Sequence, residues 1–470
     1  MKSTKPVTES LSLRDEIVGI DERVPLLNGK KAPYVFLDNA ASTPALSASA
    51  EAVNNLLPYY SSVHRGTGFK SRLSTGAYEK AHEIIGKFVG ADLETNTVIF
   101  TKNTTEAINK LSYRLGLKKD SIIITSHMEH HSNDLPWRSK AKVIRVDITE
   151  DGQLDEDDFD RKLKKYAGQI GLVTITGASN VSGFLLPVHR LARKAHEAGS
   201  KILIDAAQLA PHREIDMKPD KDPEHLDFVA LSAHKMYAPF GSGALIGPRD
   251  FFLESAPEYT GGGTVDMVSD EEVWWADLPD RDEAGSPNVI GAVAMAAAAQ
   301  QLMNVSMDLI ATHEELLISY ALEQLRTVPG IKLYGETDPQ KAYTKVGVIP
   351  FNLGDYSHSL LAAILGYEGG IGVRSGCFCA HPYVVHLLGL SEKEAEAWRQ
   401  QLKKGDRSNM PGMVRISFGC YNTTDDVDRL VEMLKKIADG DYEGHYELIP
   451  STGEYIPEDY TDEFGDYYEL

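Results

Sequence analysis

A lysine follows one apolar segment of the chain at a position where it could carry out chemistry. Residues 228–231 are apolar and indicate a buried strand, and Ser232, Ala233, His234 and Lys235 come directly after them. Burial opposes the charged form of an amine, and a neutral amine can form a Schiff base with a carbonyl group. Taken alone, the segment is explained equally well by a surface lysine at a strand end.

A carboxylate follows a second apolar segment about thirty residues earlier. Residues 201–205 end in Asp205, and Ala206, Ala207 and Gln208 follow. Pyridoxal phosphate needs a lysine for its aldehyde and a carboxylate for its pyridinium nitrogen, which keeps the ring protonated as an electron sink. The two strand ends together therefore predict a pyridoxal-phosphate site.

Further polar residues stand where predicted strands end. Asn103, Thr104 and Thr105 lie between a strand and a helix, so that backbone N–H groups and hydroxyls could face an anion, although a plain helix cap has the same pattern. Residues 127–131 (His-Met-Glu-His-His) lack the HExxH spacing, so we expect no metal site and favour an imidazole, His130, stacked on an aromatic ring. The glycine triplet before Thr264 is only a weak phosphate-loop signal.

The elements that must position these residues alternate between strand and helix, which predicts an α/β fold with a seven-stranded, mostly parallel sheet covered by helices. The expected strands are residues 97–101, 121–125, 142–147, 171–176, 201–205, 228–231 and 243–247, and the expected helices are residues 105–114, 156–166 and 187–198. Ligands bind such sheets at the carboxyl ends of the strands.

Four regions are expected along the 470 residues. An N-terminal segment, residues 1–30, should pack with a small domain. Residues 31–304 should form the large cofactor-binding domain, and residues 305–440 a smaller α+β domain. An Ala-rich helix, residues 292–303, should lead into a long helix, residues 313–327. The small α+β unit should contain strands 346–351, 372–374 and 413–418 and helix 424–437.

The last region, residues 441–470, is an acidic tail rich in tyrosine. Eleven carboxylates and no Lys or Arg lie from Asp439 to Glu469, and six tyrosines interrupt them. We expect a strand-poor extension packed on the body or on a second subunit rather than free disorder.

Composition narrows the class of protein. A net charge of −21 argues against a nucleic-acid partner, and no run approaches the roughly 20 apolar residues of a membrane helix. Residues 1–20 do not have the pattern of a secretory signal. Three cysteines are too few for a disulfide framework, so a reducing, cytoplasmic setting is expected.

In this order along the chain, these motifs resemble those of the class V aminotransferase family of fold-type I pyridoxal-phosphate enzymes, and within it the SufS-like cysteine desulfurase and selenocysteine lyase branch. The segments that carry the resemblance are residues 36–43, 63–66, 103–106, 128–133, 179–183, 205–208, 232–235, 261–264 and 374–380. The first eight point to the cofactor family, and only the last, Arg-Ser-Gly-Cys-Phe-Cys-Ala, points to desulfuration.

The resemblance implies a role for each matching residue. Lys235 would hold the cofactor, Asp205 would pair with the ring nitrogen, Gln208 would donate to the ring hydroxyl, and His130 would stack on the ring and shuttle protons. The phosphate would be bound by Thr104, Thr105, Ser232, His234 and, from the second subunit of a homodimer, Thr264. Asn180, Arg374 and Arg415 would lie on the substrate side, with Arg415 binding the substrate carboxylate through its fork. Cys379 would be the nucleophile.

The implied reaction is conversion of L-cysteine to L-alanine, with the sulfur retained as a persulfide on Cys379 and passed to an acceptor protein in iron–sulfur cluster assembly. Two departures leave the acceptor open. Cys377 forms a Cys-Phe-Cys pair that looks like the desulfurase domain of molybdenum cofactor sulfurases, and the charged, helical segment 391–411 is longer than in the SufS-like pattern.

Three alternatives are retained. The chain could be a selenocysteine lyase, or it could catalyse another class V transamination or C–S lysis in which Cys379 is not the nucleophile. It could also be a non-enzymatic sulfur carrier or scaffold, although Lys235, Asp205 and His130 argue against that.

Overall fold

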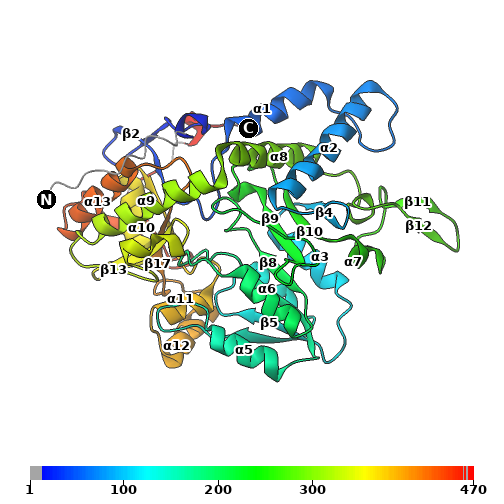
Figure 1. The fold of residues 1–470 in the computed structure, drawn as a ribbon. Coiled ribbons are helices and arrows are strands. Elements are labelled where there is room, and N and C mark those ends of the chain that lie inside the picture. The colour runs from blue at the N-terminus through cyan, green and yellow to red at the C-terminus, as the bar shows by residue number, and fades with distance from the viewer. Residues whose placement is uncertain (1–12, 459, 462–463, 470) are drawn as a thin grey trace.

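A seven-stranded sheet forms the centre of the large part of the structure, a computed structural model that describes residues 13–458, 460–461 and 464–469 (Figure 1). All seven predicted strands are present, each within one residue of its predicted bounds. In sheet order they are β4 (Asn96–Thr101), β10 (Gly243–Pro248), β9 (Phe228–Ser232), β8 (Ile202–Asp205), β7 (Ile170–Thr176), β5 (Ile122–Ser126) and β6 (Lys142–Val146). Only β10 runs antiparallel to its neighbours, so the prediction of a mostly parallel sheet is confirmed.

Helices cover both faces of this sheet, which explains why its strands are almost continuously apolar. Along β9, Val229 and Leu231 pack into one buried cluster, while Phe228 and Ala230 pack into another. The first cluster is covered by α1 (Ser47–Leu56), α2 (Phe69–Phe88), α5 (Glu156–Lys165), α6 (Val188–Glu197) and α8 (Val289–Val305). The second is covered by α3 (Thr104–Arg114), α4 (Leu135–Arg138) and α7 (Arg249–Leu253).

A smaller antiparallel sheet lies in the C-terminal part of the chain. Its order is β13 (Ile331–Leu333), β14 (Val348–Leu353), β17 (Met413–Ser417) and β16 (Arg374–Gly376). A separate buried cluster joins this sheet to α9 (Met307–Leu325), α10 (His358–Tyr367) and α13 (Thr424–Ala438). This α+β unit matches the expected one except that the predicted strand 372–374 is divided between β15 (Ile371–Gly372), which lies in another sheet, and β16. A domain boundary at residues 304/305 stays a prediction.

No single helix among the described residues is long and apolar enough to cross a membrane. The consecutive helices α8 and α9 reach that length and composition only as a pair, and they are bent by 77° where they meet.

The segment before the large sheet is built into the C-terminal unit. A hairpin of β1 (Arg23–Pro25) and β2 (Lys31–Pro33) leads to β3 (Val35–Phe36), which pairs in parallel with β15 (Ile371–Gly372). Leu27 N–H donates to Tyr367 O at 2.8 Å. Of these residues, β1 and Leu27 belong to the N-terminal segment 1–30. Residues 1–12 of that segment lie outside the described part of the chain.

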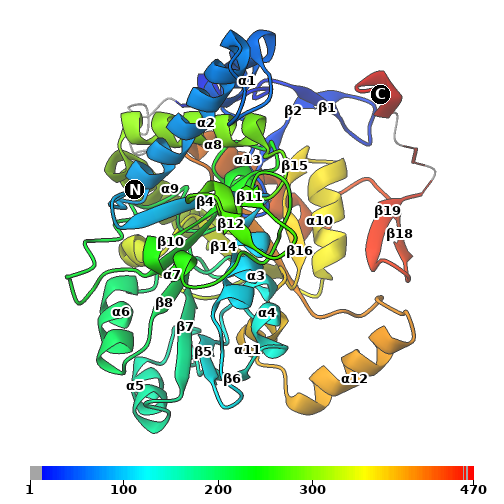
Figure 2. The same cartoon turned by 90° about the vertical axis from the view of Figure 1, so that its right-hand side faces the viewer.

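The tail is packed on the body, as expected, but the expectation that it is poor in strands was wrong. It forms a hairpin of β18 (Tyr446–Ile449) and β19 (Glu454–Pro457) beside α10 (Figure 2). The Glu368 carboxylate accepts hydrogen bonds from two tail N–H groups and from Tyr446 Oη. The turn Ser451-Thr452-Gly453 lets the two strands pair, which the acidic composition did not indicate. Residues 459, 462–463 and 470 lie outside the described part of the chain.

The remaining elements are short or lie at the edge of the body. Helices α11 (His381–Leu387) and α12 (Glu392–Lys403) follow the cysteine loop, and the hairpin of β11 (Val265–Val268) and β12 (Val273–Trp275) projects from the large part (Figure 1). The 3-10 helices are η1 (Arg14–Glu16), η2 (Leu57–Tyr59), η3 (His131–Asn133), η4 (Ala233–Lys235), η5 (Asp280–Asp282), η6 (Pro339–Thr344) and η7 (Phe464–Asp466).

Candidate active site

Almost all the predicted site residues line one cavity of about 490 Å³ at the carboxyl ends of the parallel strands. Those that line it are Thr104, Thr105, His130, Asn180, Asp205, Gln208, Ser232, His234, Lys235, Arg374, Cys379 and Arg415. Residues from the large sheet form one side, and residues from β16, β17 and the cysteine loop form the other. The cavity therefore lies where the two parts of the chain meet.

Thr264 is the one predicted site residue that does not line this cavity. It is fully buried at the base of the β11–β12 hairpin, where its hydroxyl donates to Gly261 O at 2.8 Å. Within a single chain, Thr264 thus supports its own loop.

Lys235 lies at the end of the 3-10 turn η4, directly after β9, and is half-buried where it lines the cavity. Burial lowers the pKa of Lys235 to about 8, although Asp205 opposes the shift. Burial also raises the pKa of Asp205. A lysine with this pKa is partly neutral near pH 8, as an amine that reacts with a carbonyl must be.

The lysine turn is anchored by the segment 38–43. His234 O accepts hydrogen bonds from Thr43 N–H at 2.9 Å and from the hydroxyl of Ser42 at 3.1 Å. The same segment is fixed to β17, because Ala40 N–H donates to the Ser417 hydroxyl at 2.8 Å. This double attachment holds the lysine turn close to the C-terminal unit.

An anion cradle forms at the N-terminus of α3, next to Lys235. Asn103 caps the helix by accepting from Glu106 N–H at 2.9 Å, and Thr104 N–H donates to the Ser232 hydroxyl at 2.9 Å. A Cβ on Gly243 would lie 2.7 Å from Asn103 Cα, so only glycine lets β10 pass this close. The Thr104 hydroxyl is buried and has no hydrogen-bond partner among the described residues.

Two histidines of the cavity are held neutral. Burial, followed by the charge of Lys235, lowers the pKa of His130 to about 3 and that of His234 to about 4. His130 Nδ1 lies 3.0 Å from the Ser132 hydroxyl, which fixes the ring. A neutral imidazole of fixed orientation can stack on an aromatic ring and can accept a proton only transiently.

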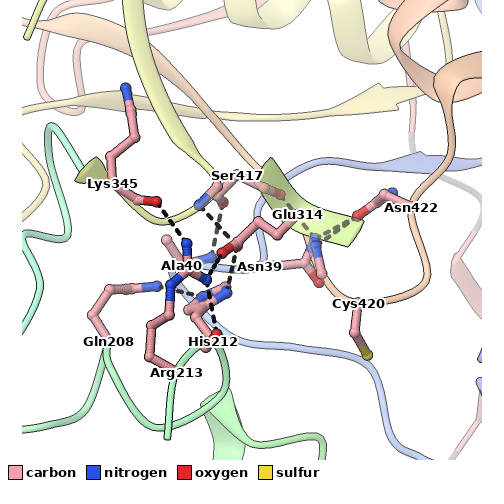
Figure 3. Close-up of polar contacts among 12 residues, drawn as sticks. Asn39, Ala40, Gln208, His212, Arg213, Glu314, Lys345, Ser417, Cys420 and Asn422 are labelled. Atoms are coloured by element: carbon pink, nitrogen blue, oxygen red, sulfur yellow. Dashed lines mark hydrogen bonds and ion pairs between the residues drawn. The ribbon is translucent and has the colours of Figure 1, made fainter. Parts of the chain in front are cut away.

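Gln208 is oriented by a buried chain of polar groups that extends into the C-terminal unit (Figure 3). Its amide nitrogen lies 3.2 Å from His212 Nε2, and His212 Nδ1 lies 2.6 Å from Glu314 on α9. Burial alone would raise the pKa of Glu314, but His212 and Arg213 lower it to about 2. The other amide atom, Gln208 Oε1, is buried and finds no hydrogen-bond partner among the residues that the structure describes.

Arg415 lies at the bottom of the opposite wall, 2% exposed. Its Nη1 donates to Asn180 O and its Nη2 to Asp38, both at 2.9 Å, while its Nε is buried and has no hydrogen-bond partner in the described part of the chain. Arg374 Nε contacts the other oxygen of Asp38 at 3.0 Å. Two guanidinium groups and one carboxylate leave a net positive site suited to a small anion.

Asp38 was missed by the sequence analysis, which used residues 36–43 only for the resemblance. Its position directly after a short apolar stretch, in Leu37-Asp38-Asn39, was the available signal. The pairing with Arg415 could not be read from the sequence, since the partners lie 377 residues apart.

The cysteine loop places its two thiols in different surroundings. Cys379 is exposed and lines the cavity, whereas Cys377 is buried and its Sγ lies 3.1 Å from Pro411 O. Burial, followed by the charge of Cys379, raises the pKa of Cys377 to about 12. Cys377 is therefore a thiol at neutral pH, and a thiol is a poor nucleophile.

This loop is a tight turn. Ala380 N–H donates to Cys377 O at 2.9 Å, and both central residues, Phe378 and Cys379, have positive φ, 50° and 54°. Asn180 donates to Phe378 O at 2.7 Å and His131 N–H donates to Cys379 O at 2.8 Å. These bonds hold a backbone conformation that non-glycine residues rarely adopt.

The chain matches known proteins along most of its length. The aminotransferase class-V family model matches residues 35–430. A cysteine desulfurase of Haloferax volcanii is 35% identical over 417 residues, which cover 86% of this chain and 89% of that protein. A probable cysteine desulfurase of Halalkalibacterium halodurans is 34% identical, covering 88% and 95%.

Solved structures give the same result. An apo cysteine desulfurase of Thermococcus onnurineus superposes with a TM-score of 0.78 at 29% identity, covering 94% of this chain and 100% of that one. The cysteine desulfurase CsdA of Escherichia coli superposes with a TM-score of 0.73 at 27% identity, covering 91% and 97%. The expected fold-type I architecture is thus confirmed.

Proposed function

The chain belongs to the class-V aminotransferase family, and on that premise we propose that it is a pyridoxal-phosphate-dependent cysteine desulfurase that converts L-cysteine to L-alanine. The observation that carries the proposal is a single cavity that brings Lys235, Asp205 and His130 together with Arg415 and the exposed thiol of Cys379. The first three suit the cofactor, the fourth suits a carboxylate, and the fifth suits attack on sulfur.

The residues present fit pyridoxal phosphate. The buried, unpartnered hydroxyl of Thr104 and amide oxygen of Gln208 both face the cavity, and each needs a hydrogen-bond partner that the described residues do not supply. Thr104, Thr105, Ser232 and His234 would hold the phosphate, Asp205 the ring nitrogen, and Lys235 the aldehyde carbon. When bound, the cofactor would withdraw electrons from the substrate Cα.

The chain's own residues perform the remaining tasks. Arg415, with Arg374 beside it, binds and orients the substrate carboxylate, which must compete with Asp38 for the guanidinium groups. Lys235, with a pKa of about 8, accepts the Cα proton in its neutral form. The thiolate of Cys379 then attacks the substrate sulfur, so that an S–S bond forms on Cys379 while the C–S bond of the substrate breaks. The electron pair of the C–S bond stays with the three-carbon fragment, which takes up a proton and leaves as alanine.

We further propose a two-fold homodimer in which the exposed loop of residues 261–263, with Thr264 turned out of its buried position, reaches from each chain to the phosphate site of the other. Around Thr264, the projecting hairpin exposes Met267, Val268, Val273 and Trp274, each more than 40% exposed. A cluster of exposed apolar side chains on a projecting hairpin is typical of an interaction surface. An acceptor protein for the sulfur, iron–sulfur cluster assembly as its use, and a cytoplasmic location stay predictions.

The test is to incubate the pure, yellow protein with L-cysteine and a reductant and to quantify alanine and sulfide, with L-selenocysteine in parallel. Borohydride reduction followed by peptide mapping should place a pyridoxyl group on Lys235, and Lys235→Ala should lose both the group and the products. Absence of that group would reject the cofactor assignment, and pyruvate or an amino-exchange product instead of alanine would indicate another class V reaction.

A further inference from the structure

The segment 391–411, which is longer than in the SufS-like pattern, folds against the cysteine loop. It contains α12, a helix of 12 residues that lies next to α11 (Figure 1) and buries only Ala395 and Trp398. Most of the other side chains of α12 are charged and exposed. An isolated helix of this length is marginal in water, so the position of α12 depends on its short buried side. Trp398, the larger of the two buried side chains, is therefore its main contact with the body.

Three rings form a column that runs from α12 to the large part of the structure. Trp398 stacks on His381, with ring centroids 5.7 Å apart and an angle of 28°, and His381 stacks on His131 at 4.9 Å and 3°. His381 Nδ1 lies 3.0 Å from His131 Nε2. Burial lowers the pKa of both histidines, so that one neutral ring can donate its N–H to the other. Trp398 Nε1 is buried and has no hydrogen-bond partner among the described residues, so packing rather than hydrogen bonding holds the indole in place.

The column ends on the backbone of the cysteine loop. His381 is the first residue of α11 and comes two positions after Cys379, and the backbone N–H of His131 donates to Cys379 O at 2.8 Å. The loop needs such support, because Phe378 and Cys379 both have positive φ, which costs about 1–3 kcal/mol for each non-glycine residue. Contacts from outside the loop must offset that cost.

The other end of the segment contacts the chain just before Cys379. Cys377 Sγ donates to Pro411 O at 3.1 Å, and His358 Nε2 on α10 lies 2.9 Å from Met410 O. The segment 391–411 thus contacts the chain two residues before Cys379 and two residues after it. A loop that is held on both flanks keeps its central residues in one conformation.

We propose that the segment 391–411 braces the cysteine loop in its left-handed turn, with Trp398 and His381 as positioning residues for the attack of Cys379 on the substrate sulfur. Neither side chain lines the cavity, so each acts through the loop. Attack on sulfur requires the nucleophile, the sulfur and the departing carbon to be nearly in line, and a misplacement of about 1 Å can cost about 100-fold in rate. The inference rests on the proposed desulfurase function.

The first test follows a single turnover, in which no reductant removes the persulfide and each chain forms one alanine. Trp398→Ala and His381→Leu each remove one ring of the column. Each should slow alanine formation by at least about 10-fold, while the KM for cysteine and the cofactor absorbance stay within about two-fold of the parent, because Arg374 and Arg415 are untouched. Trp398→Phe, which keeps a ring on His381, should retain most of the rate.

His386→Leu is the matched control. His386 lies on the same helix, α11, and its Nε2 lies 3.0 Å from Thr149 O, outside the column. This variant should form alanine at the parent rate. Trp398→Leu replaces Trp398→Ala if the latter does not fold, since leucine fills part of the space without stacking.

The second test does not depend on activity and compares the two buried cysteines. Cys377 is covered by the end of the segment, whereas Cys420 lies after β17, outside both the loop and the segment. Burial raises the pKa of each thiol to about 12, so the two are matched in reactivity. Alkylation with iodoacetamide and peptide mass mapping measure both in one sample. Trp398→Ala and His381→Leu should label Cys377 at least about 10-fold faster than the parent and leave Cys420 as slow, because only the loop is loosened.

Three results would overturn the proposal. The first is parent-like labelling of Cys377 and parent-like alanine rates in both folded variants. The second is equally accelerated labelling of Cys377 and Cys420, which would show that the column supports the whole fold. The third is faster labelling of Cys377 with an unchanged alanine rate, which would show that the column holds the loop without positioning the thiol. If the parent itself forms no alanine, the proposed function fails, and the labelling still decides whether the segment holds the loop.

Discussion

The two cysteines of the loop are only two positions apart in the chain, yet their thiols differ in exposure and therefore in reactivity. Cys379 is exposed in the cavity, while Cys377 is buried beside Pro411 and its pKa is raised to about 12. A raised pKa leaves almost no thiolate at neutral pH, so the buried thiol cannot share the work of the exposed one.

We therefore expect Cys379→Ser to keep the cofactor absorbance and to lose alanine formation by at least about 100-fold, because a hydroxyl is a far weaker nucleophile than a thiolate. Cys377→Ser should retain most turnover. Parallel alanine assays and mass-spectrometric detection of the persulfide check both. Equal loss in the two variants would indicate a relay between two thiols.

Single site residues could be predicted where they follow a strand. They could not be predicted where their position and role depend on a contact with a residue far away in the sequence. Lys235 and Asp205 could be found because an apolar strand precedes each, and parallel strands bring their carboxyl ends together. The Asp38 bridge between Arg374 and Arg415, and the His212–Glu314 support of Gln208, depend on contacts across hundreds of residues. No local pattern encodes those contacts.

At the scale of elements, periodicity identified the seven central strands but not the short hairpins. The central strands are buried on both faces and read as apolar runs. The strands of the pairs β1–β2, β11–β12 and β18–β19 are three or four residues long and largely exposed, so they carry little hydrophobic signal. The C-terminal hairpin is held instead by Glu368 and by Arg407, whose N–H donates to Pro450 O at 2.8 Å.

Deleting residues 441–470 should lower the melting temperature by several degrees and leave cofactor absorbance and the KM for cysteine unchanged, because the hairpin contacts α10 and Arg407 but does not line the cavity. Tyr446→Phe, which removes only the bond to Glu368, should cost about 1 kcal/mol. Loss of the yellow colour in a folded truncation would show that the tail helps to build the site.

At the scale of the whole molecule, the position of Thr264 outside its own cavity links the proposed activity to assembly. Trp274→Asp should shift the protein from dimer to monomer and weaken cofactor binding, since a charge on the exposed hairpin opposes burial. Sedimentation velocity and cofactor absorbance measure the two effects. Tyr343→Asp, which alters an aromatic residue on η6 that is even more exposed than Trp274 (62% against 41%), is the control; a fully active monomer would contradict the proposed dimer.

Global stability should depend on a buried lysine far from the surface. Lys345 is fully buried, its Nζ has only Glu336 O at 3.3 Å, and Figure 3 shows the side chain extending away from the Glu314 cluster. Burial lowers the pKa of Lys345 to about 7, although Glu336 and Glu314 oppose the shift.

At pH values between the folded pKa of about 7 and the unfolded pKa of 10.5, the unfolded state holds one more proton on this lysine than the folded state. The lysine therefore lowers the free energy of unfolding as the pH falls from about 10 to about 7. Lys345→Met should remove that loss, gaining about 1.4 kcal/mol at pH 7 for each unit of the shift. Urea unfolding at both pH values measures it, with Lys341→Met on the surface as the control. A parent and variant that respond alike to pH would show that Lys345 stays charged when folded.

The pairing of Asp38 with Arg415 also has a consequence for the newly made chain. The two residues are 377 positions apart, which at about 5–20 residues per second corresponds to roughly 20 seconds to more than a minute of synthesis. Toward the end of that interval the lysine turn and the phosphate cradle have left the ribosome, while the arginine that completes the substrate side has not been translated. A nascent chain can thus meet the cofactor well before it can discriminate among amino acids.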